Sequence, residues 1–90
     1  MTGTLIVRHP VQDYDAWRVV YEEVGALRNQ HGCTAERVLR LPTDGNDVVA
    51  IHDFPSVAQA EAFASDPELK AAMERAGVAG APRIEIFAGV

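Results

Sequence analysis

The spacing of apolar and polar residues changes repeatedly along the chain, and each change predicts a new element. Residues 5–7 form a short apolar run, which predicts a strand ending near Pro10 because proline has no N–H for a sheet. Between residues 14 and 31 the apolar positions recur every three or four residues, as on one face of a helix. Asp13 is the expected N-cap of this helix, and Gly32 is the expected left-handed residue after its end.

The middle of the chain predicts a hairpin of two strands. Residues 33–41 and 47–54 are rich in alternating apolar and polar positions and in β-branched residues. Between them, residues 42–46 read Pro-Thr-Asp-Gly-Asn, and the last three of these tolerate positive φ. We therefore expect a turn over 42–46.

Two capping signals predict a second helical region in the latter half. Ser56 opens a capping box, which predicts a helix over 56–64. An Asp-Pro pair at 66–67 restarts the helix, which should end at Gly77. A final strand is expected at 83–88, after a Gly-Ala-Pro stretch.

The predicted order is β-α-β-β-α-β, with the second helix interrupted near residue 66. This order is typical of the ferredoxin-like α+β fold, in which a four-stranded antiparallel sheet carries both helices on one face. A chain of 90 residues has room for one domain, so we expect a single unit over 1–90.

The predicted sheet is apolar on both faces. In the strand 47–54 the even-numbered residues point one way, while Val49 and Ile51 point the other. Two helices cover only one face, so the other would be buried most simply against the same face of a second copy. We expect a homodimer formed through this sheet face; short strands that are apolar on both sides in a monomer are the alternative.

Composition limits the partners and the compartment. With 48% apolar residues, 23% charged residues and a net charge of −5, the chain is an ordinary globular domain without a basic run, so no nucleic-acid partner is expected. The single cysteine, Cys33, cannot form an internal disulfide, which favours a reducing compartment. No signal peptide and no apolar run near the ~20 residues of a membrane span is present, so we expect a cytoplasmic protein without membrane contact.

The first helix carries the sharpest candidate site. At 100° per residue, Trp17, Tyr21, Val24 and Arg28 fall within a sector of roughly 60°, with His31 at its edge. A charged guanidinium in line with two aromatic residues predicts a small apolar pocket under the helix that meets an anionic or phenolate group. In the alternative, the two cations only complement the helix dipole in its last turn.

Histidines are the remaining candidates for chemistry near neutral pH. His9 and His52 fall on strands that the topology places side by side, although a structural role for His52 is the alternative. No metal-ligand spacing and no glycine-rich phosphate loop is present, so neither a metal nor a cofactor is expected. The candidate catalytic residues are His9, Arg28 and His52, and the candidate substrate-binding residues are Trp17, Tyr21, His31 and Phe54.

Several short motifs spread over nearly the whole chain resemble a known superfamily. They are His9, Asp13-Tyr14-Asp15-Ala16-Trp17, Ser65-Asp66-Pro67-Glu68-Leu69-Lys70 with Ala72-Met73, Ala76-Gly77-Val78, Gly80 and Pro82. The pattern resembles small stand-alone bacterial proteins of the dimeric α/β-barrel superfamily, on the antibiotic-biosynthesis-monooxygenase-like side. The resemblance implies a homodimer whose two sheets pack face to face into a barrel.

The resemblance also implies a range of activities. Members include cofactor-free oxygenases of polycyclic phenols, lactone isomerases, haem-handling enzymes and proteins without known chemistry. The oxygenase pockets use Trp, Tyr, Asn and Arg side chains, and Trp17, Tyr21 and Arg28 supply three of these types here.

Two hypotheses about function follow. In the first, the protein binds a planar aromatic or polyketide-like molecule and acts as a cofactor-independent monooxygenase or a cyclase/isomerase. In the second, it is a non-catalytic homodimer that binds a small ligand or stabilises a partner. Convergence of His9, His52 and Arg28 on one cavity would favour the enzyme, and separate pairing with local carboxylates such as Asp53 would favour the second hypothesis.

Overall fold

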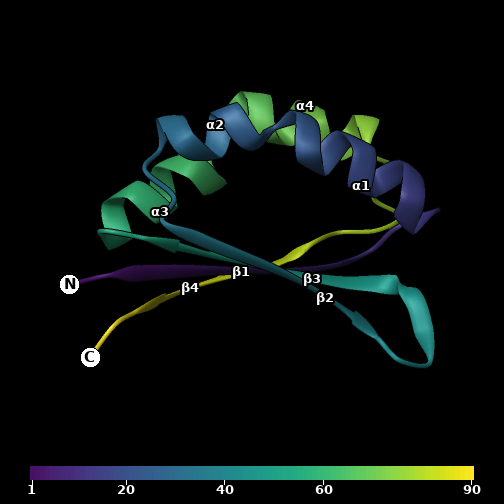
Figure 1. The fold of residues 1–90 in the computed structure, drawn as a ribbon, viewed down its shortest axis with the longest axis horizontal. Helices are drawn as coiled ribbons and strands as arrows, with labels where there is room; N and C mark the ends of the chain where they lie inside the picture. The colour runs from purple at the N-terminus through teal and green to yellow at the C-terminus, as the bar shows by residue number, and fades with distance from the viewer.

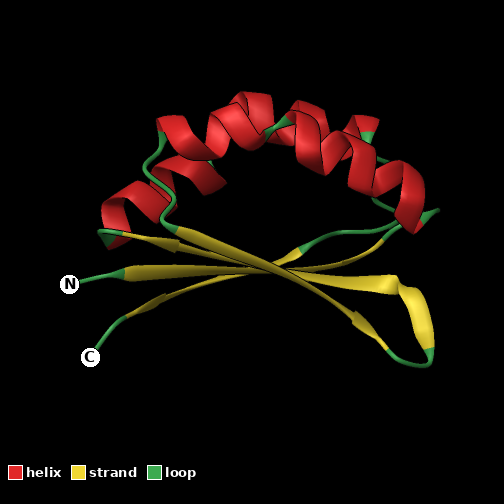
Figure 2. Cartoon of the chain, viewed as in Figure 1, coloured by secondary structure: helices red, strands yellow, loops and turns green.

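Four strands form one antiparallel sheet, and all of the helices lie over one of its faces (Figures 1 and 2). The computed structural model describes residues 1–90. The strand order is β2-β3-β1-β4, so the first and third strands lie at the centre of the sheet. The elements are β1 (Gly3–Pro10), α1 (Tyr14–Glu23), α2 (Gly25–Gln30), β2 (Ala35–Leu41), β3 (Asp44–Phe54), α3 (Val57–Ala64), α4 (Pro67–Arg75) and β4 (Arg83–Ala88).

This architecture confirms the ferredoxin-like α+β prediction, with each of the two helical regions divided in two. The break between α3 and α4 falls at the predicted Asp-Pro pair. The break between α1 and α2 was not predicted: the helix expected over 14–31 is interrupted at Val24, where φ is −89° and ψ is 13°. Gly25 follows directly, and glycine has the lowest helix propensity after proline.

Two of the predicted helix caps are present. The Ser56 hydroxyl accepts the backbone N–H of Gln59 at 3.2 Å, and Asp66 accepts that of Glu68 at 2.8 Å. Each bond satisfies one of the N–H groups that a helix leaves free at its start.

The N-cap of α1 is at the predicted residue but lacks a side-chain hydrogen bond. Asp13 has the extended backbone of an N-cap residue, but its side chain makes no capping hydrogen bond. The Asn46 side-chain oxygen accepts the backbone N–H of Tyr14 at 3.0 Å instead. A residue of the hairpin between β2 and β3 therefore caps the first helix.

The hairpin turn is also tighter than predicted. β3 begins at Asp44, so the turn consists of Pro42 and Thr43, with a register shift between residues 40 and 41. No residue in the turn has a positive φ, because Gly32 and Gly77 are the only residues with one, at +83° and +79°. The two glycines expected to end helices therefore do so, while the positive φ expected in the turn is absent.

The core lies between the helices and the inner face of the sheet. Buried strand residues on this face include Leu5, Val48 and Phe54, each at most 1% exposed. The helices bury Trp17 and Phe63 against them. None of the helices has both the length and the apolar character needed to cross a lipid bilayer.

The outer face of the sheet carries apolar side chains from every strand. Ile6, Val49 and Ile51 are partly buried at its centre. Leu39 and Phe87, on the two edge strands, are 46% and 53% exposed. This arrangement confirms that the sheet is apolar on both sides, with helices on only one of them.

Candidate functional site

A cavity of about 50 Å³ lies between the inner face of the sheet and the helices. Of its 14 lining residues, 11 are hydrophobic, and the other three are His9, Arg28 and His52. Trp17 and Tyr21, also predicted from the sequence, line the cavity as well. The structure thus brings together five of the seven candidate residues.

Helical and strand periodicity place these side chains around the cavity. Trp17 and Tyr21 are one turn apart on α1, and Arg28 extends the same stripe onto α2. His9 and His52 come from the adjacent strands β1 and β3, where both face the helices and are only 3% and 4% exposed.

The aromatic rings form a row with a histidine at each end. Trp17 and Tyr21 stack with their centroids 4.9 Å apart and their planes at 22°. The His9 ring meets the edge of Trp17 at 5.7 Å, and the His52 ring lies 5.9 Å from Tyr21. The two aromatic residues are thus packed face to face between the two histidines, where a ligand in the cavity would meet both aromatic and polar groups.

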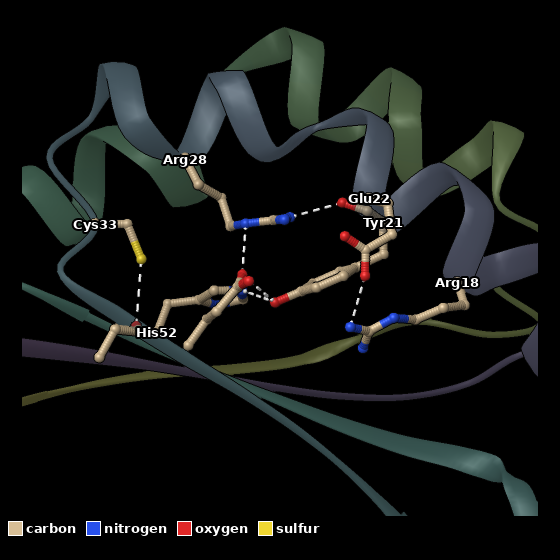
Figure 3. Close-up of polar contacts among 8 residues, drawn as sticks. Arg18, Tyr21, Glu22, Arg28, Cys33 and His52 are labelled. Atoms are coloured by element: carbon tan, nitrogen blue, oxygen red, sulfur yellow. Dashed lines mark hydrogen bonds and ion pairs between the residues drawn. The ribbon is translucent and has the colours of Figure 1, made fainter.

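Arg28 is buried and already paired within the protein (Figure 3). Its Nε lies 2.7 Å from the Glu36 carboxylate, and its Nη1 donates to the backbone oxygen of Tyr21 at 2.8 Å. The guanidinium also lies over the Tyr21 ring, 4.0 Å from the centroid. These contacts offset the cost of burying the charge.

The Tyr21 hydroxyl connects this ion pair to a histidine. It donates to the Glu36 carboxylate at 2.8 Å and lies 3.0 Å from His52 Nε2. Burial, followed by the hydrogen bond to Glu36, raises the pKa of Tyr21. The phenol therefore stays protonated at neutral pH.

Burial favours the neutral form of both cavity histidines. Burial, followed by the nearby Arg28 charge, lowers the pKa of His52 to about 4, although Glu36 opposes the shift. Burial alone lowers the pKa of His9. The neutral imidazoles can each offer a lone pair to a ligand.

Three ring nitrogens of these histidines have no hydrogen-bond partner in the protein. They are Nδ1 and Nε2 of His9 and Nδ1 of His52, all of them buried. Leaving such groups unsatisfied costs about 1–3 kcal/mol each, so native proteins pair them with water or a ligand. The two histidines that line the apolar cavity therefore keep hydrogen-bonding capacity that no other group of the protein uses.

The other two candidates lie outside the cavity. His31 Nε2 lies 2.8 Å from the Asp66 carboxylate, and its ring packs on the edge of Phe63 at 5.6 Å. It joins the end of α2 to the start of α4, and its hydrogen bond lowers the pKa of Asp66. Phe54 is 1% exposed and packs on Phe63 in the core.

Glu36, which links Arg28 to Tyr21, was not predicted from the sequence. Its position could have been predicted, because a hairpin that pairs residue 41 with residue 47 also pairs Glu36 with His52. The structure contains this Glu36–His52 pair. It was missed because charged residues on an edge strand are normally solvated. The structure contains no group of three or more His, Cys, Asp and Glu side chains that could hold a metal ion.

No protein-family model matches the sequence, and no curated protein matches it either. Several solved structures do match over nearly the whole chain. SnoaB of Streptomyces nogalater, described as a cofactor-independent oxygenase, superposes with a TM-score of 0.80 at 15% identity, covering 99% of this chain and 93% of its own.

Two further structures also match over nearly the whole chain. A Caulobacter crescentus protein provisionally named an antibiotic biosynthesis monooxygenase has a TM-score of 0.79 at 20% identity, covering 99% of this chain and 90% of its own. Rv0793 of Mycobacterium tuberculosis has a TM-score of 0.67 at 12% identity, covering 100% and 96%. The chain therefore has the fold of the antibiotic-biosynthesis-monooxygenase-like proteins, as its motifs predicted.

Proposed function

We propose that the protein is a homodimeric, cofactor-independent oxygenase that acts on a planar phenol bound in the cavity under α1 and α2. The observation that carries the proposal is the convergence of His9, Arg28 and His52 on one apolar cavity, with three histidine nitrogens left unpaired. The fold is shared with SnoaB, described as a cofactor-independent oxygenase.

The proposed chemistry requires only a base and a stabilised anion. Loss of a proton makes a phenol a better electron donor to O₂, and a neutral histidine can accept that proton. If the ring system carries an activated CH₂ group, its oxidation to a ketone by one O₂ releases one water, so no external reductant is needed. The Arg28 charge favours this step because it stabilises the phenolate next to an otherwise apolar surface.

Ligand size sets a condition on this proposal. A cavity of about 50 Å³ is smaller than the ~150 Å³ apolar cavity known to admit benzene. Binding of a phenol therefore requires lining side chains to shift. Met73 on α4 is suited to this, because it lines the cavity and methionine is unbranched and flexible.

The outer face of the sheet supports the homodimer. Its apolar side chains, including Ile51 and Phe87, would be buried by the same face of a second copy. Charged side chains lie around them, such as the Arg8–Asp47 pair at 2.9 Å, as expected at the rim of an interface. A domain of this size also gains from such burial, because its own core is small.

One observation favours a second candidate, a homodimer that binds a small ligand without catalysis. Arg28 already pairs with Glu36 and the Tyr21 carbonyl, so part of its charge is used within the protein. A ligand held by stacking and by the histidines alone would be bound but not activated.

One experiment separates the two candidates. Trp17 is the only tryptophan, so its fluorescence reports directly on the cavity during titration with planar phenols and anthrone-like compounds. Oxygen consumption would be followed in the same samples, with His52→Phe as the test variant and His31→Phe, outside the cavity, as its control. Saturable quenching with one O₂ consumed per substrate supports the oxygenase, quenching without oxygen consumption supports the binding protein, and no quenching contradicts both.

A further inference from the structure

Four side chains form one continuous chain of polar contacts from the protein surface to the cavity (Figure 3). Arg28 Nε contacts Oε2 of Glu36 at 2.7 Å, and the Tyr21 hydroxyl contacts the same oxygen at 2.8 Å. The Tyr21 hydroxyl then contacts His52 Nε2 at 3.0 Å. Glu36 is the one exposed member of the chain, with 41% of its side chain accessible, while Arg28 and His52 at its two ends are buried.

The direction of each hydrogen bond follows from which atoms carry protons. A carboxylate oxygen can only accept, so Arg28 and Tyr21 both donate to Glu36. Tyr21 has a single hydroxyl proton, which this bond uses. The contact with His52 must then be donated by the histidine, from Nε2–H to the tyrosine oxygen.

This assignment fixes the tautomer of the imidazole. A neutral imidazole has one N–H, so with Nε2 protonated the lone pair is on Nδ1. His52 Nδ1 is buried and has no partner in the protein. The neighbouring groups cannot supply one, because Leu5 and Phe63 are apolar and Asp53 is bonded to Thr4 on the other face.

We propose that Tyr21 and Glu36 are positioning residues, which hold His52 in the Nε2–H tautomer and reserve Nδ1 as a hydrogen-bond acceptor for a ligand O–H. The inference rests on the proposed function for the identity of the ligand, and it narrows the substrate class to phenols that enter the cavity protonated. A ligand that presents only ether or carbonyl oxygens would leave Nδ1 unsatisfied, and a site built to bond a hydroxyl discriminates against an analogue that lacks it.

Nitrogen NMR tests the tautomer without any ligand. In uniformly ¹⁵N-labelled protein at pH 7, we expect His52 to show a protonated Nε2 and an unprotonated Nδ1. Tyr21→Phe removes the oxygen that accepts from Nε2–H, so the two His52 nitrogen shifts should move towards each other as the tautomers exchange. Tyr14→Phe is the matched control, because Tyr14 is also on α1 and contacts Trp17 but not His52. A protonated Nδ1 in the wild type, or unchanged shifts in Tyr21→Phe, overturns the proposal.

A pair of ligands tests the selectivity that follows. Titration of Trp17 fluorescence with 2-naphthol and its methyl ether compares the same ring with and without an O–H group. We expect the wild type and Tyr14→Phe to bind the naphthol about tenfold more tightly, and Tyr21→Phe to lose most of that preference. Equal affinities of the wild type for the naphthol and its methyl ether would overturn the proposal that Nδ1 is reserved as a hydrogen-bond acceptor. Failure of both compounds to bind overturns the ligand class of the proposed function as well, and the NMR result then decides the positioning role by itself.

Discussion

The position of Arg28 could be predicted from the sequence, but its main contact in the structure could not. Its place in the stripe with Trp17 and Tyr21 is where helical periodicity puts it, and it does line the cavity. Its nearest charged neighbour, however, is Glu36 on an edge strand. Helical spacing predicts which way a side chain faces, but not which partner a distant strand brings to it.

Replacing Arg28 by methionine should therefore destabilise the fold. We expect the free energy of unfolding to fall by about 1–3 kcal/mol, since the Tyr21 carbonyl and Glu36 lose their donor while Glu36 remains accessible to water. Urea denaturation measures the loss. Arg18→Met is the control, because the Arg18–Glu22 pair is exposed and should contribute less than about 1 kcal/mol. Equal losses in the two variants would contradict a buried structural pair.

The neutral histidines predict a pH dependence of stability. The pKa of His52 is lowered in the folded protein to about 4, so between that value and its ordinary 6.5 the unfolded chain binds more protons. Stability should fall as the pH is lowered through this window, by at most about 1.4 kcal/mol per pH unit for each histidine. The pKa of His9 is lowered as well, which adds to the fall.

Urea denaturation between pH 7 and pH 4 measures this slope. Four groups around His52 contribute to its environment: Arg28 opposes its protonation, Glu36 and Asp53 favour it, and Tyr21 bonds Nε2. His52→Phe should show a shallower slope than the wild type. An unchanged slope in that variant would show that the buried imidazole is not what titrates.

At the scale of elements, most boundaries could be predicted because their signals are local. Ser56 and the Asp-Pro pair at 66–67 lie within a few residues of the N–H groups that they cap. The cap of α1 could not be predicted in this way, since Asn46 lies 32 residues from Tyr14 in sequence. The break at Val24 was missed because the apolar stripe continues through it.

Asn46 should accordingly matter more to α1 than Asp13 does. Asn46→Ala removes the acceptor of the Tyr14 N–H, so we expect a loss of about 0.5–2 kcal/mol in the free energy of unfolding. Asp13→Ala removes no capping bond and should cost only the few tenths of a kcal/mol that an acidic residue contributes at a helix start. Thermal unfolding followed by circular dichroism compares the two, and a larger loss for Asp13→Ala would contradict the assignment.

At the scale of the whole molecule, the sheet has one face covered by helices and one that is apolar and open (Figure 2). Alternation along the strands was enough to predict both faces. It was also enough to place His9 and His52 on the core face of the two neighbouring central strands, where His9 pairs with Val48 and His52 with Leu5. The cavity volume depends on how side chains from four helices pack together, and no sequence pattern contains it.

The proposed homodimer predicts different effects for substitutions at two exposed apolar positions. Phe87 lies on the outer sheet face and Val19 on α1, and they are 53% and 60% exposed. Phe87→Glu would place two like charges in the proposed interface, so we expect sedimentation to show monomers at micromolar concentration. Val19→Glu adds the same charge elsewhere and should leave the dimer intact. A monomeric wild type, or a dimeric Phe87→Glu variant, would contradict the proposed interface.

The contact between Asn46 and Tyr14 also bears on the order in which the chain folds. Residues 44–46 occupy their places only once β2 and β3 have paired, and the Asn46 side chain is then in reach of the first turn of α1. An isolated helix of ten residues is marginal in water, so α1 gains little from forming earlier. We therefore expect the hairpin to form first in refolding, and the helix that covers the cavity to become protected from hydrogen exchange only afterwards.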